Sequence, residues 1–398
     1  MEQEQIGNAN HEIGDGIVEN ISGKIRAIFA EHMVKITDIK AVVGPTVTTY
    51  KVYPASGVRF TKISRIQDDI AISLMTWSVR VVMLPDCVCI EVANDHTSIV
   101  SLKSLLDSEE FRDSKAELPV AIGSDAEGNP IIIDLAHAPH ILMVGLTKHG
   151  KTTEIHSLIL SLLSFRIPND VKFVFVDPKG YELSAYKSLS DRYMFSACTA
   201  EEKVVTTMLG TETVLCALSR ELESRYATIA SAEADNIYQY NAFCTTVEKM
   251  PYIVLVIDEF ADLMDPDCMD KKSDKISNEI LKLIVSLAQK GHTVGIHLVI
   301  TTQKPSSKVI SNIIKSNFPI RMAFRVSSRS ESKTIIGTVG AERLVGKGDM
   351  IFSNGCDCTR IQGAYVTRKE LEEAVKGLEF KRGCLKTEKF KNAYIRIF

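Results

Sequence analysis

The chain has 398 residues, of which 45% are hydrophobic and 24% are charged, so it can build a sizeable core and two or three domains. Its 47 Lys and Arg residues against 50 Asp and Glu residues give a net charge of −3. This balance excludes a uniformly cationic chain, and any contact with nucleic acid must come from a local basic patch. No run approaches the roughly 18 apolar residues of a membrane span, and the polar start is unlike a secretory signal, so a cytoplasmic protein is predicted.

The first part of the chain is predicted to be a disordered start, residues 1–14, followed by a small α+β domain over residues 15–115. Residues 1–14 are polar and show no period. Apolar residues then recur at helical spacing over 17–33, and a strand-like stretch follows at 39–52. The region 63–92 reads as a helix followed by strands.

From residue 116 to residue 382 the pattern is that of an α/β domain. Continuous apolar runs alternate with amphipathic segments, which is typical of a parallel sheet buried on both faces by helices. The runs are HILMVG, KFVFVD, YIVLVIDE, IHLVITTQ and IRMAFRV. The remaining residues, 383–398, are basic and are predicted to be a loose tail.

A phosphate-binding loop lies between the first of these strands and the helix after it. The segment GLTKHGKT, residues 145–152, matches the G-x-x-x-x-G-K-[ST] pattern between a strand and a helix, which is the context that supports a P-loop. Loop N–H groups and Lys151 would bind the phosphates, and the Thr152 hydroxyl would bind Mg²⁺. The alternative is a turn that only happens to hold these glycines. The predicted ATP-binding residues are Gly145, Leu146, Thr147, Lys148, His149, Gly150, Lys151, Thr152 and Thr153.

Two carboxylates follow the strand Ile253–Ile257. Adjacent ionised groups at a strand end repel each other unless a cation neutralises them, so Asp258 is predicted to hold Mg²⁺ and Glu259 to accept the proton of the attacking water. The alternative is a solvated turn. Gln303 ends the strand Ile296–Thr302 and is predicted to sense the γ-phosphate and the attacking water, against the alternative of a polar residue that merely leaves a strand.

From roughly residue 17 to residue 380 the sequence resembles the FtsK/SpoIIIE family of DNA translocases. Matching stretches include FVFVDPKGYELSAY, PYIVLVIDEFADLM, GIHLVITTQKPSSKVISNIIKSNFPIRMAF and GAERLVGKGDM. The resemblance implies a RecA-like P-loop NTPase of the α/β class, with its parallel sheet between helices and a small α+β domain before it. It also implies a homo-hexameric ring around double-stranded DNA, driven by ATP and Mg²⁺.

The resemblance also implies roles for basic residues outside the ATP site. It places DNA contacts at Lys304, Ser306 and Lys315 in the segment after the sensor strand. It relates Arg329 and Lys333 to the neighbouring subunit's nucleotide and to a second DNA-contacting loop.

The sequence departs from the family pattern in several places. Lys148-His149 replaces the usual Gly-Ser of the P-loop, and His292 stands where the family has an arginine finger, which leaves Arg329 or Lys290 as substitutes or implies slower hydrolysis. The chain is expected to be a short soluble form without the family's membrane domain and winged-helix γ domain, so a separate partner would supply membrane anchoring or DNA reading.

Two alternatives stay open at this point. A motor of the same fold can serve conjugative DNA transfer or protein secretion. The substrate would separate these readings, and the lysines after the sensor strand favour DNA as the substrate. A non-catalytic ATP-binding scaffold is favoured by the absent finger arginine and opposed by the intact Lys151, Asp258 and Glu259.

Overall fold

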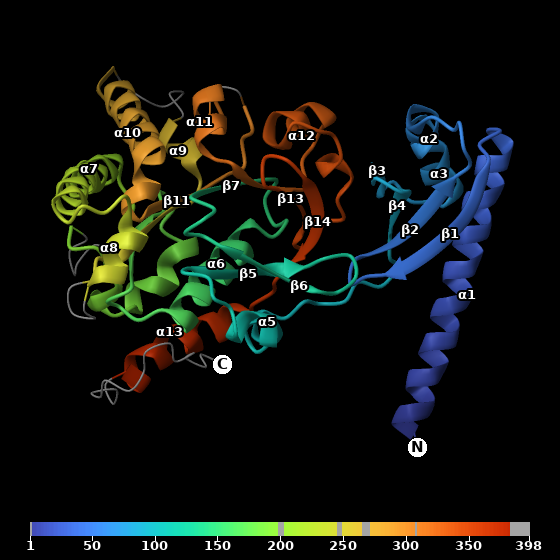
Figure 1. Cartoon of the computed structure of the whole chain (residues 1–398), viewed down its shortest axis with the longest axis horizontal. Helices are drawn as coiled ribbons and strands as arrows, with labels where there is room; N and C mark the ends of the chain where they lie inside the picture. Colours follow the sequence, from blue (N-terminus) through green and yellow to red (C-terminus); the bar gives the residue numbers. More distant parts are fainter. Residues whose placement is uncertain (1, 198–202, 245–248, 265–270, 307–308, 383–398) are drawn as a thin grey trace. The chain divides into compact units, whose positions relative to one another are not determined.

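The computed structural model describes residues 2–197, 203–244, 249–264, 271–306 and 309–382. The predicted basic tail, 383–398, lies outside these residues. The chain forms two compact units, one made of residues 1–99, 124–129 and 343–345 and the other of residues 100–123, 130–342 and 346–398 (Figure 1). This division differs from the expected boundary near residue 115, because helices α4 and α5 pack against α6 and β6 of the second unit.

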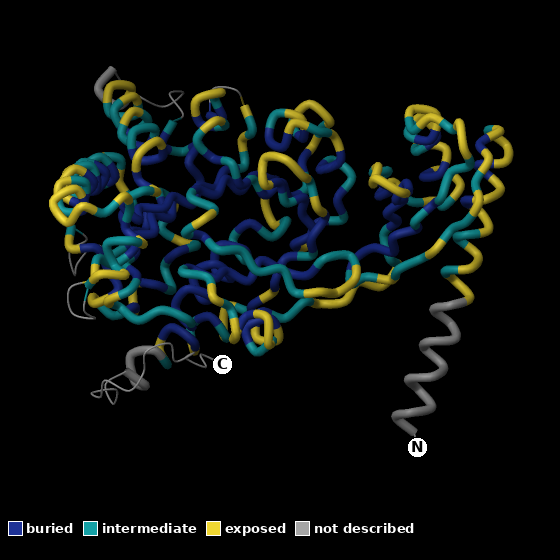
Figure 2. Tube along the Cα trace, in the orientation of Figure 1, coloured by how far each residue is buried: buried dark blue, intermediate teal, exposed yellow. Residues whose placement is uncertain are grey.

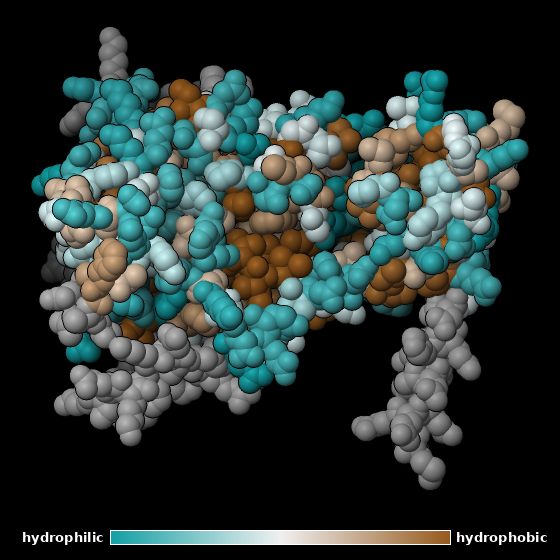
Figure 3. Space-filling model, in the orientation of Figure 1, coloured by the Kyte–Doolittle hydropathy of each residue, from teal (hydrophilic) through white to brown (hydrophobic). Residues whose placement is uncertain are grey.

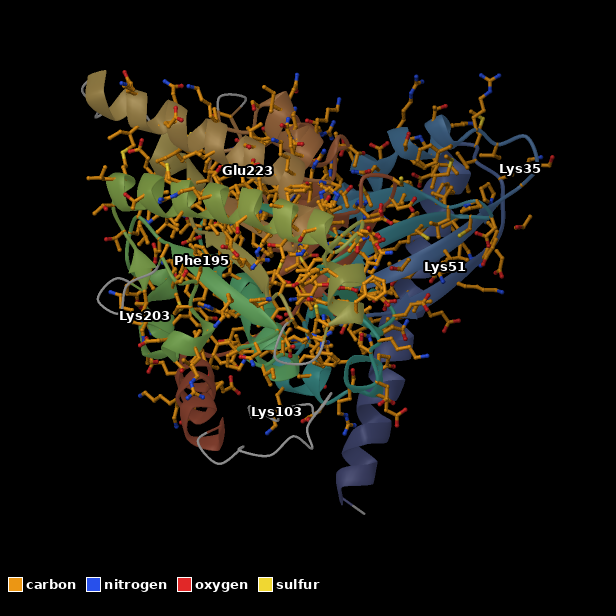
Figure 4. The ribbon with its side chains drawn as sticks, turned by 60° about the vertical axis from the view of Figure 1, so that its left-hand side comes forward. Lys35, Lys51, Lys103, Phe195, Lys203 and Glu223 are labelled. Atoms are coloured by element: carbon orange, nitrogen blue, oxygen red, sulfur yellow. The ribbon has the colours of Figure 1, made fainter. Side chains whose placement is uncertain are left out.

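The first unit is a four-stranded antiparallel sheet with helices packed on it. The strand order is β1-β2-β4-β3, and Tyr50 of β2 and Ile90 of β4 lie opposite each other in its fully buried core with Phe29 of α1. Lys51 of β2, labelled in Figure 4, donates a 2.8 Å hydrogen bond to Glu127 and so ties residues 124–129 to this unit. Its elements are α1 (Glu2–Glu31), β1 (Ile36–Val43), β2 (Val47–Pro54), α2 (Phe60–Arg65), α3 (Gln67–Ser73), β3 (Val79–Met83) and β4 (Val88–Ala93).

The structure differs from the expectation of a disordered start. Helix α1 runs over Glu2–Glu31 and includes the polar residues 1–14 from Glu2 onward. A polar stretch extends a helix when it continues one whose apolar residues are packed, because adding a residue to an existing helix is much less costly than starting one. Ile25 and Phe29, both fully buried, supply that packing.

The second unit is built on a large mixed sheet flanked by helices. Among the described residues its strand order is β6-β5-β14-β13-β12-β7-β11-β10-β8-β9. The predicted parallel core is confirmed for β12, β7, β11, β10 and β8, whereas β13 and β14 extend it in the antiparallel direction. The strands are β5 (Pro119–Ser124), β6 (Pro130–Asp134), β7 (His140–Val144), β8 (Val171–Val176), β9 (Val204–Val205), β10 (Tyr252–Ile257), β11 (Ile296–Thr302), β12 (Ile320–Phe324), β13 (Asp349–Ser353) and β14 (Cys358–Gly363).

The helices of this unit pack in two groups, α7 with α10 and α6 with α4 and α13. Figure 1 shows α10 and α11 above the strands and α5 and α13 below them. The helices are α4 (Leu102–Leu106), α5 (Glu109–Arg112), α6 (Lys151–Phe165), α7 (Met208–Ser231), α8 (Ile237–Phe243), α9 (Phe260–Met264), α10 (Lys271–Lys290), α11 (Asn312–Asn317), α12 (Arg329–Ile336) and α13 (Arg368–Arg382), with 3₁₀ turns η1 (Glu182–Ser188), η2 (Asp191–Tyr193), η4 (Gly291–Val294) and η5 (Ala341–Arg343).

The sheet is the core of the second unit. Every residue of β7, β10 and β11 is buried, as the dark strands of Figure 2 show, which is the burial expected for parallel strands covered on both faces. The surface over α10 is mostly hydrophilic (Figure 3), as an amphipathic helix packed on α7 requires. Within the described residues, no helix combines the length and the apolar character that crossing a membrane demands. The arrangement is the RecA-like α/β fold, as predicted.

Candidate ATP site

The P-loop connects β7 to α6 and is held by the ends of two neighbouring strands. The N–H of Gly145 donates to the Thr302 carbonyl at 3.3 Å, and the N–H of Leu146 donates to the Arg325 carbonyl at 2.9 Å. Gly150 ends the loop at φ 116°, where a Cβ atom would lie 2.6 Å from the Cα of Gly348. Only glycine fits both this backbone conformation and this close approach, so the shape of the loop depends on glycine at this position.

Lys151 is the first residue of α6 and points back into the loop. Its Nζ donates to the carbonyl oxygens of Gly145 at 2.6 Å and Leu146 at 2.9 Å. Burial lowers the pKa of Lys151 to about 8, and the charges of Glu259 and Asp258 oppose that shift. The nearby carboxylates therefore help to keep the buried lysine cationic near neutral pH.

Asp258 and Glu259 follow β10 and are both buried, at 7% and 3% exposed. The Thr301 hydroxyl donates to Asp258 Oδ1 at 2.5 Å and accepts the Glu259 N–H at 3.1 Å. Burial raises the pKa of Asp258, with the charges of Asp177 and Glu259 in the same direction and the Thr301 hydrogen bond and Lys151 against it. A cation bound at Asp258 would relieve that burial cost, so this end of β10 fits metal binding better than a solvated turn.

Glu259 is held in an uncommon backbone conformation, at φ 51°. Its Oε1 accepts the Gln303 N–H at 3.1 Å and the Thr302 hydroxyl at 3.3 Å. Left-handed backbone at a residue other than glycine persists only where the surroundings enforce it, and such residues cluster at functional sites. The end of β11 therefore holds one oxygen of the carboxylate expected to act as the base.

Gln303 connects this carboxylate to the P-loop. Strand β11 lies next to β7, and the Thr147 hydroxyl donates to Gln303 Oε1 at 2.5 Å. Lys151, Asp258, Glu259 and Gln303 thus lie at one edge of the sheet and are linked through the loop and the end of β11. Thr152 and Thr153 follow on the first turn of α6, both partly buried.

The P-loop residues that depart from the family pattern take different positions. Lys148 is exposed and has φ 63°. His149 packs against the turn before β13, where a Cβ atom on Gly346 would lie 2.4 Å from His149 Nδ1, and its carbonyl accepts the Gly348 N–H at 3.0 Å. Burial, followed by the charges of Arg325 and Lys151, lowers the pKa of His149. The imidazole is therefore a packed neutral group at neutral pH.

The basic residues expected to contact DNA or a neighbouring subunit lie outside this cluster. Lys304 and Ser306 are exposed after β11, and Lys315 is partly buried on α11. Arg329 and Lys333 are exposed on α12, where Arg329 Nε lies 3.8 Å from Glu342 Oε1. His292 lies in η4, directly before β11, so it is at the opposite edge of the sheet from the P-loop.

Sequence reasoning missed two residues of the site, Asp177 and Lys179. Asp177 follows β8 and is fully buried, and Lys179 Nζ lies 3.6 Å from Glu259 Oε2. The rule that identified Asp258, an acidic residue at the carboxyl end of a buried strand, applies equally to Asp177 in KFVFVD.

The comparisons with known proteins agree with this geometry. The sequence matches the FtsK/SpoIIIE family over residues 101–307 and the FtsK alpha domain over residues 4–94. It is 37% identical over 387 residues to "DNA translocase FtsK" of Haemophilus influenzae, covering 90% of this chain and 70% of that protein. It is 38% identical over 340 residues to "DNA translocase SftA" of Bacillus subtilis, covering 83% of this chain and 34% of that protein.

Solved structures share the fold. The monomer of the pCW3 conjugation coupling protein TcpA with ATPγS has a TM-score of 0.63 at 21% identity, covering 90% of this chain and 99% of that chain. The cytoplasmic domain of the type VII secretion ATPase EccC of Thermomonospora curvata has a TM-score of 0.57 at 22% identity, covering 68% of this chain and 32% of that chain. On these matches, the chain belongs to the FtsK/SpoIIIE family and is a P-loop ATPase.

Proposed function

We propose that the chain is an ATP-driven translocase of double-stranded DNA that works in the cytoplasm as a ring, most simply a homo-hexamer. The observation that carries the proposal is the linked hydrolytic site, in which β11 holds the Glu259 carboxylate and Gln303 contacts the P-loop. DNA is proposed as the substrate because similar proteins are named DNA translocases. The chain spans 70% of the Haemophilus influenzae relative and 34% of the Bacillus subtilis one.

In the proposed reaction each residue of the site has one task. The loop N–H groups and Lys151 bind the β- and γ-phosphates, Glu259 accepts the proton of the attacking water, and Gln303 orients that water. Thr152 and Asp258 offer hard oxygen ligands, which suit Mg²⁺, and the raised pKa of buried Asp258 fits a position that a cation would neutralise. Held by Thr152 and Asp258, the ion would supply positive charge that offsets the negative charge developing on the phosphates.

The remaining predicted residues act between subunits or on DNA. We propose that four residues contact the phosphates of the DNA backbone without reading its bases, since a motor must cross every DNA sequence. They are Lys304, Ser306, Lys315 and Lys333. Arg329 is proposed to reach the neighbouring subunit's nucleotide. His292 is separated from its own P-loop by the length of β11, roughly 20 Å for seven residues, so it does not contact the nucleotide of its own subunit.

The test is steady-state ATP hydrolysis with and without linear double-stranded DNA, on the wild type and on Glu259→Ala. We expect DNA to stimulate hydrolysis and the substitution to lower kcat by about 100- to 10,000-fold, the usual contribution of a general base. Glu279→Ala, on the exposed face of α10, is the control and should hydrolyse ATP normally.

Two outcomes would contradict the proposal. Binding of ATP without hydrolysis would make the chain a scaffold. Hydrolysis that ignores DNA would point to a substrate other than double-stranded DNA.

A further inference from the structure

A cation that the predicted machinery does not include lies beside the proposed catalytic base. Lys179 Nζ is 3.6 Å from Glu259 Oε2 and 3.4 Å from Asp262 Oδ2. The Glu259 side chain is 4% exposed and the Lys179 side chain is 48% exposed. The lysine therefore approaches a buried carboxylate from the solvent side of the site.

The turn that carries Lys179 is fixed by a second buried carboxylate. Asp177 Oδ1 accepts the N–H groups of Lys179 at 3.1 Å and Gly180 at 3.0 Å, and its Oδ2 accepts the N–H of Leu183 at 3.0 Å. Gly180 takes the left-handed conformation, at φ 66°. Three backbone donors on one buried carboxylate hold the turn tightly, so the fold fixes the backbone position from which Lys179 reaches Glu259.

The two oxygens of the Glu259 carboxylate have different partners. The end of β11 donates to Oε1 through Gln303 and Thr302, and Lys179 faces Oε2. Hydrogen bonds to one oxygen leave the terminal torsion of a glutamate soft, because that torsion is broad. A cation at the second oxygen restricts this torsion to a narrower range of angles.

The other charged groups around this carboxylate do not replace Lys179. Lys151 donates to the P-loop carbonyls, and Asp258, Asp262, Asp177 and Glu182 carry the same sign as Glu259. Burial lowers the pKa of Lys179, but the charges of Glu259 and Asp262 outweigh it and the pKa is raised overall. Lys179 therefore stays charged, and its positive charge partly balances the negative charges of Glu259 and Asp262.

We propose that Lys179 is a positioning residue for ATP hydrolysis, which holds the Glu259 carboxylate in the orientation that accepts the proton of the attacking water. The proposal rests on the role of Glu259 in the proposed function. It predicts a defect in the chemical step and not in nucleotide affinity, because Lys179 contacts the base while the loop and Lys151 bind the phosphates.

The experiment compares Lys179→Met and Lys179→Gln, which remove the charge, with Lys179→Arg, which keeps it. Basal ATP hydrolysis gives kcat and KM, a fluorescent ATP analogue gives Kd, and thermal unfolding checks the fold. We expect the neutral variants to lose about 10- to 100-fold in kcat, as a slightly misplaced group does, with Kd and Tm near the wild-type values. Lys179→Arg should recover most of kcat. Lys187→Met, exposed on η1 after the same turn, is the matched control and should behave as the wild type.

The proposal is overturned if both neutral variants keep wild-type kcat. It is equally overturned if kcat falls only together with a weaker Kd or a lower Tm, or if arginine fails to restore what methionine removes. Because these measurements use basal hydrolysis, they are separate from DNA stimulation of the wild type. A wild type that hydrolyses ATP but ignores DNA would refute the DNA substrate and leave the Lys179 result valid, whereas a wild type without hydrolysis would refute both.

Discussion

The two ends of the central parallel strands bury ionisable groups in different ways. At the carboxyl ends, Asp258 and Glu259 contact hydroxyl, N–H and cationic partners. At the amino ends, His140 of β7 and His297 of β11 lie with ring centroids 6.4 Å apart. His297 Nδ1 contacts the Pro139 carbonyl at 3.0 Å, but its Nε2 has no hydrogen-bond partner among the described residues.

The difference shows what decides whether a buried group stays charged. Burial lowers the pKa of His140 to about 3 and of His297 to about 4. These rings are neutral at neutral pH and serve as packing. At the carboxyl ends, opposite charges and oriented donors offset the same burial, so charged groups persist and chemistry becomes available.

The largest effect should come from removing one hydroxyl at the carboxyl end. Thr301→Val keeps the shape but deprives Asp258 of a donor and leaves the Glu259 N–H without its acceptor. An unpaired buried group costs about 1–3 kcal/mol, so kcat should fall about 10- to 100-fold if the site bears that cost. The measurement is kcat alongside Tm. Thr211→Val removes an equally buried hydroxyl from α7 and should lower stability only. Equal kcat for both variants would show that the Thr301 contacts do not position Asp258 and Glu259 for hydrolysis.

The next effect concerns acid stability at the amino end. Because the folded pKa values of His140 and His297 lie below the ordinary 6.5, the unfolded chain binds more protons as pH falls. Stability is therefore complete above pH 6.5 and is lost progressively towards pH 4, by about 2 kcal/mol per histidine at pH 5. Urea unfolding at pH 5 and pH 7.5 should show this loss, and His297→Asn should reduce it. His96→Asn, at an exposed position, should leave the loss unchanged. If His297→Asn lost as much stability between pH 7.5 and pH 5 as the wild type, His297 would not be a buried neutral group.

The smallest effect concerns a buried carboxyl group near the P-loop that lacks, within the described part of the chain, the partners which keep Asp258 and Glu259 charged. Glu154, in the first turn of α6, is 1% exposed, and neither of its carboxyl oxygens has a hydrogen-bond partner among the described residues. Burial raises its pKa well above the ordinary value, so the folded state keeps a proton that the unfolded chain releases above pH 4.5. Stability should then fall as pH rises, and Glu154→Gln should raise Tm more at pH 8 than at pH 5. Glu223→Gln, on α7, is the control, and a gain independent of pH would show that Glu154 is not held neutral.

The sequence by itself determined the parts of the site that are local in the chain. The P-loop spacing, the carboxylates after β10 and the polar end of β11 each lie within a few residues of an apolar strand. Parallel strands place their carboxyl ends at one edge, so the meeting of Lys151, Asp258 and Gln303 was predictable from these motifs. The alternation of apolar runs with amphipathic segments predicted the α/β class, and the family resemblance specified it as RecA-like.

Only the tertiary structure decided the contacts between distant segments. The pairing of Lys179 with Glu259, the approach of Gly348 to Gly150 and the packing of His149 on Gly346 join segments that no spacing rule relates. The antiparallel strands β13 and β14 and the helix over the polar start likewise depend on packing. Motifs record what a residue type can do at a strand end, whereas the orientation of Glu259 depends on which side chains the fold brings to each of its two oxygens.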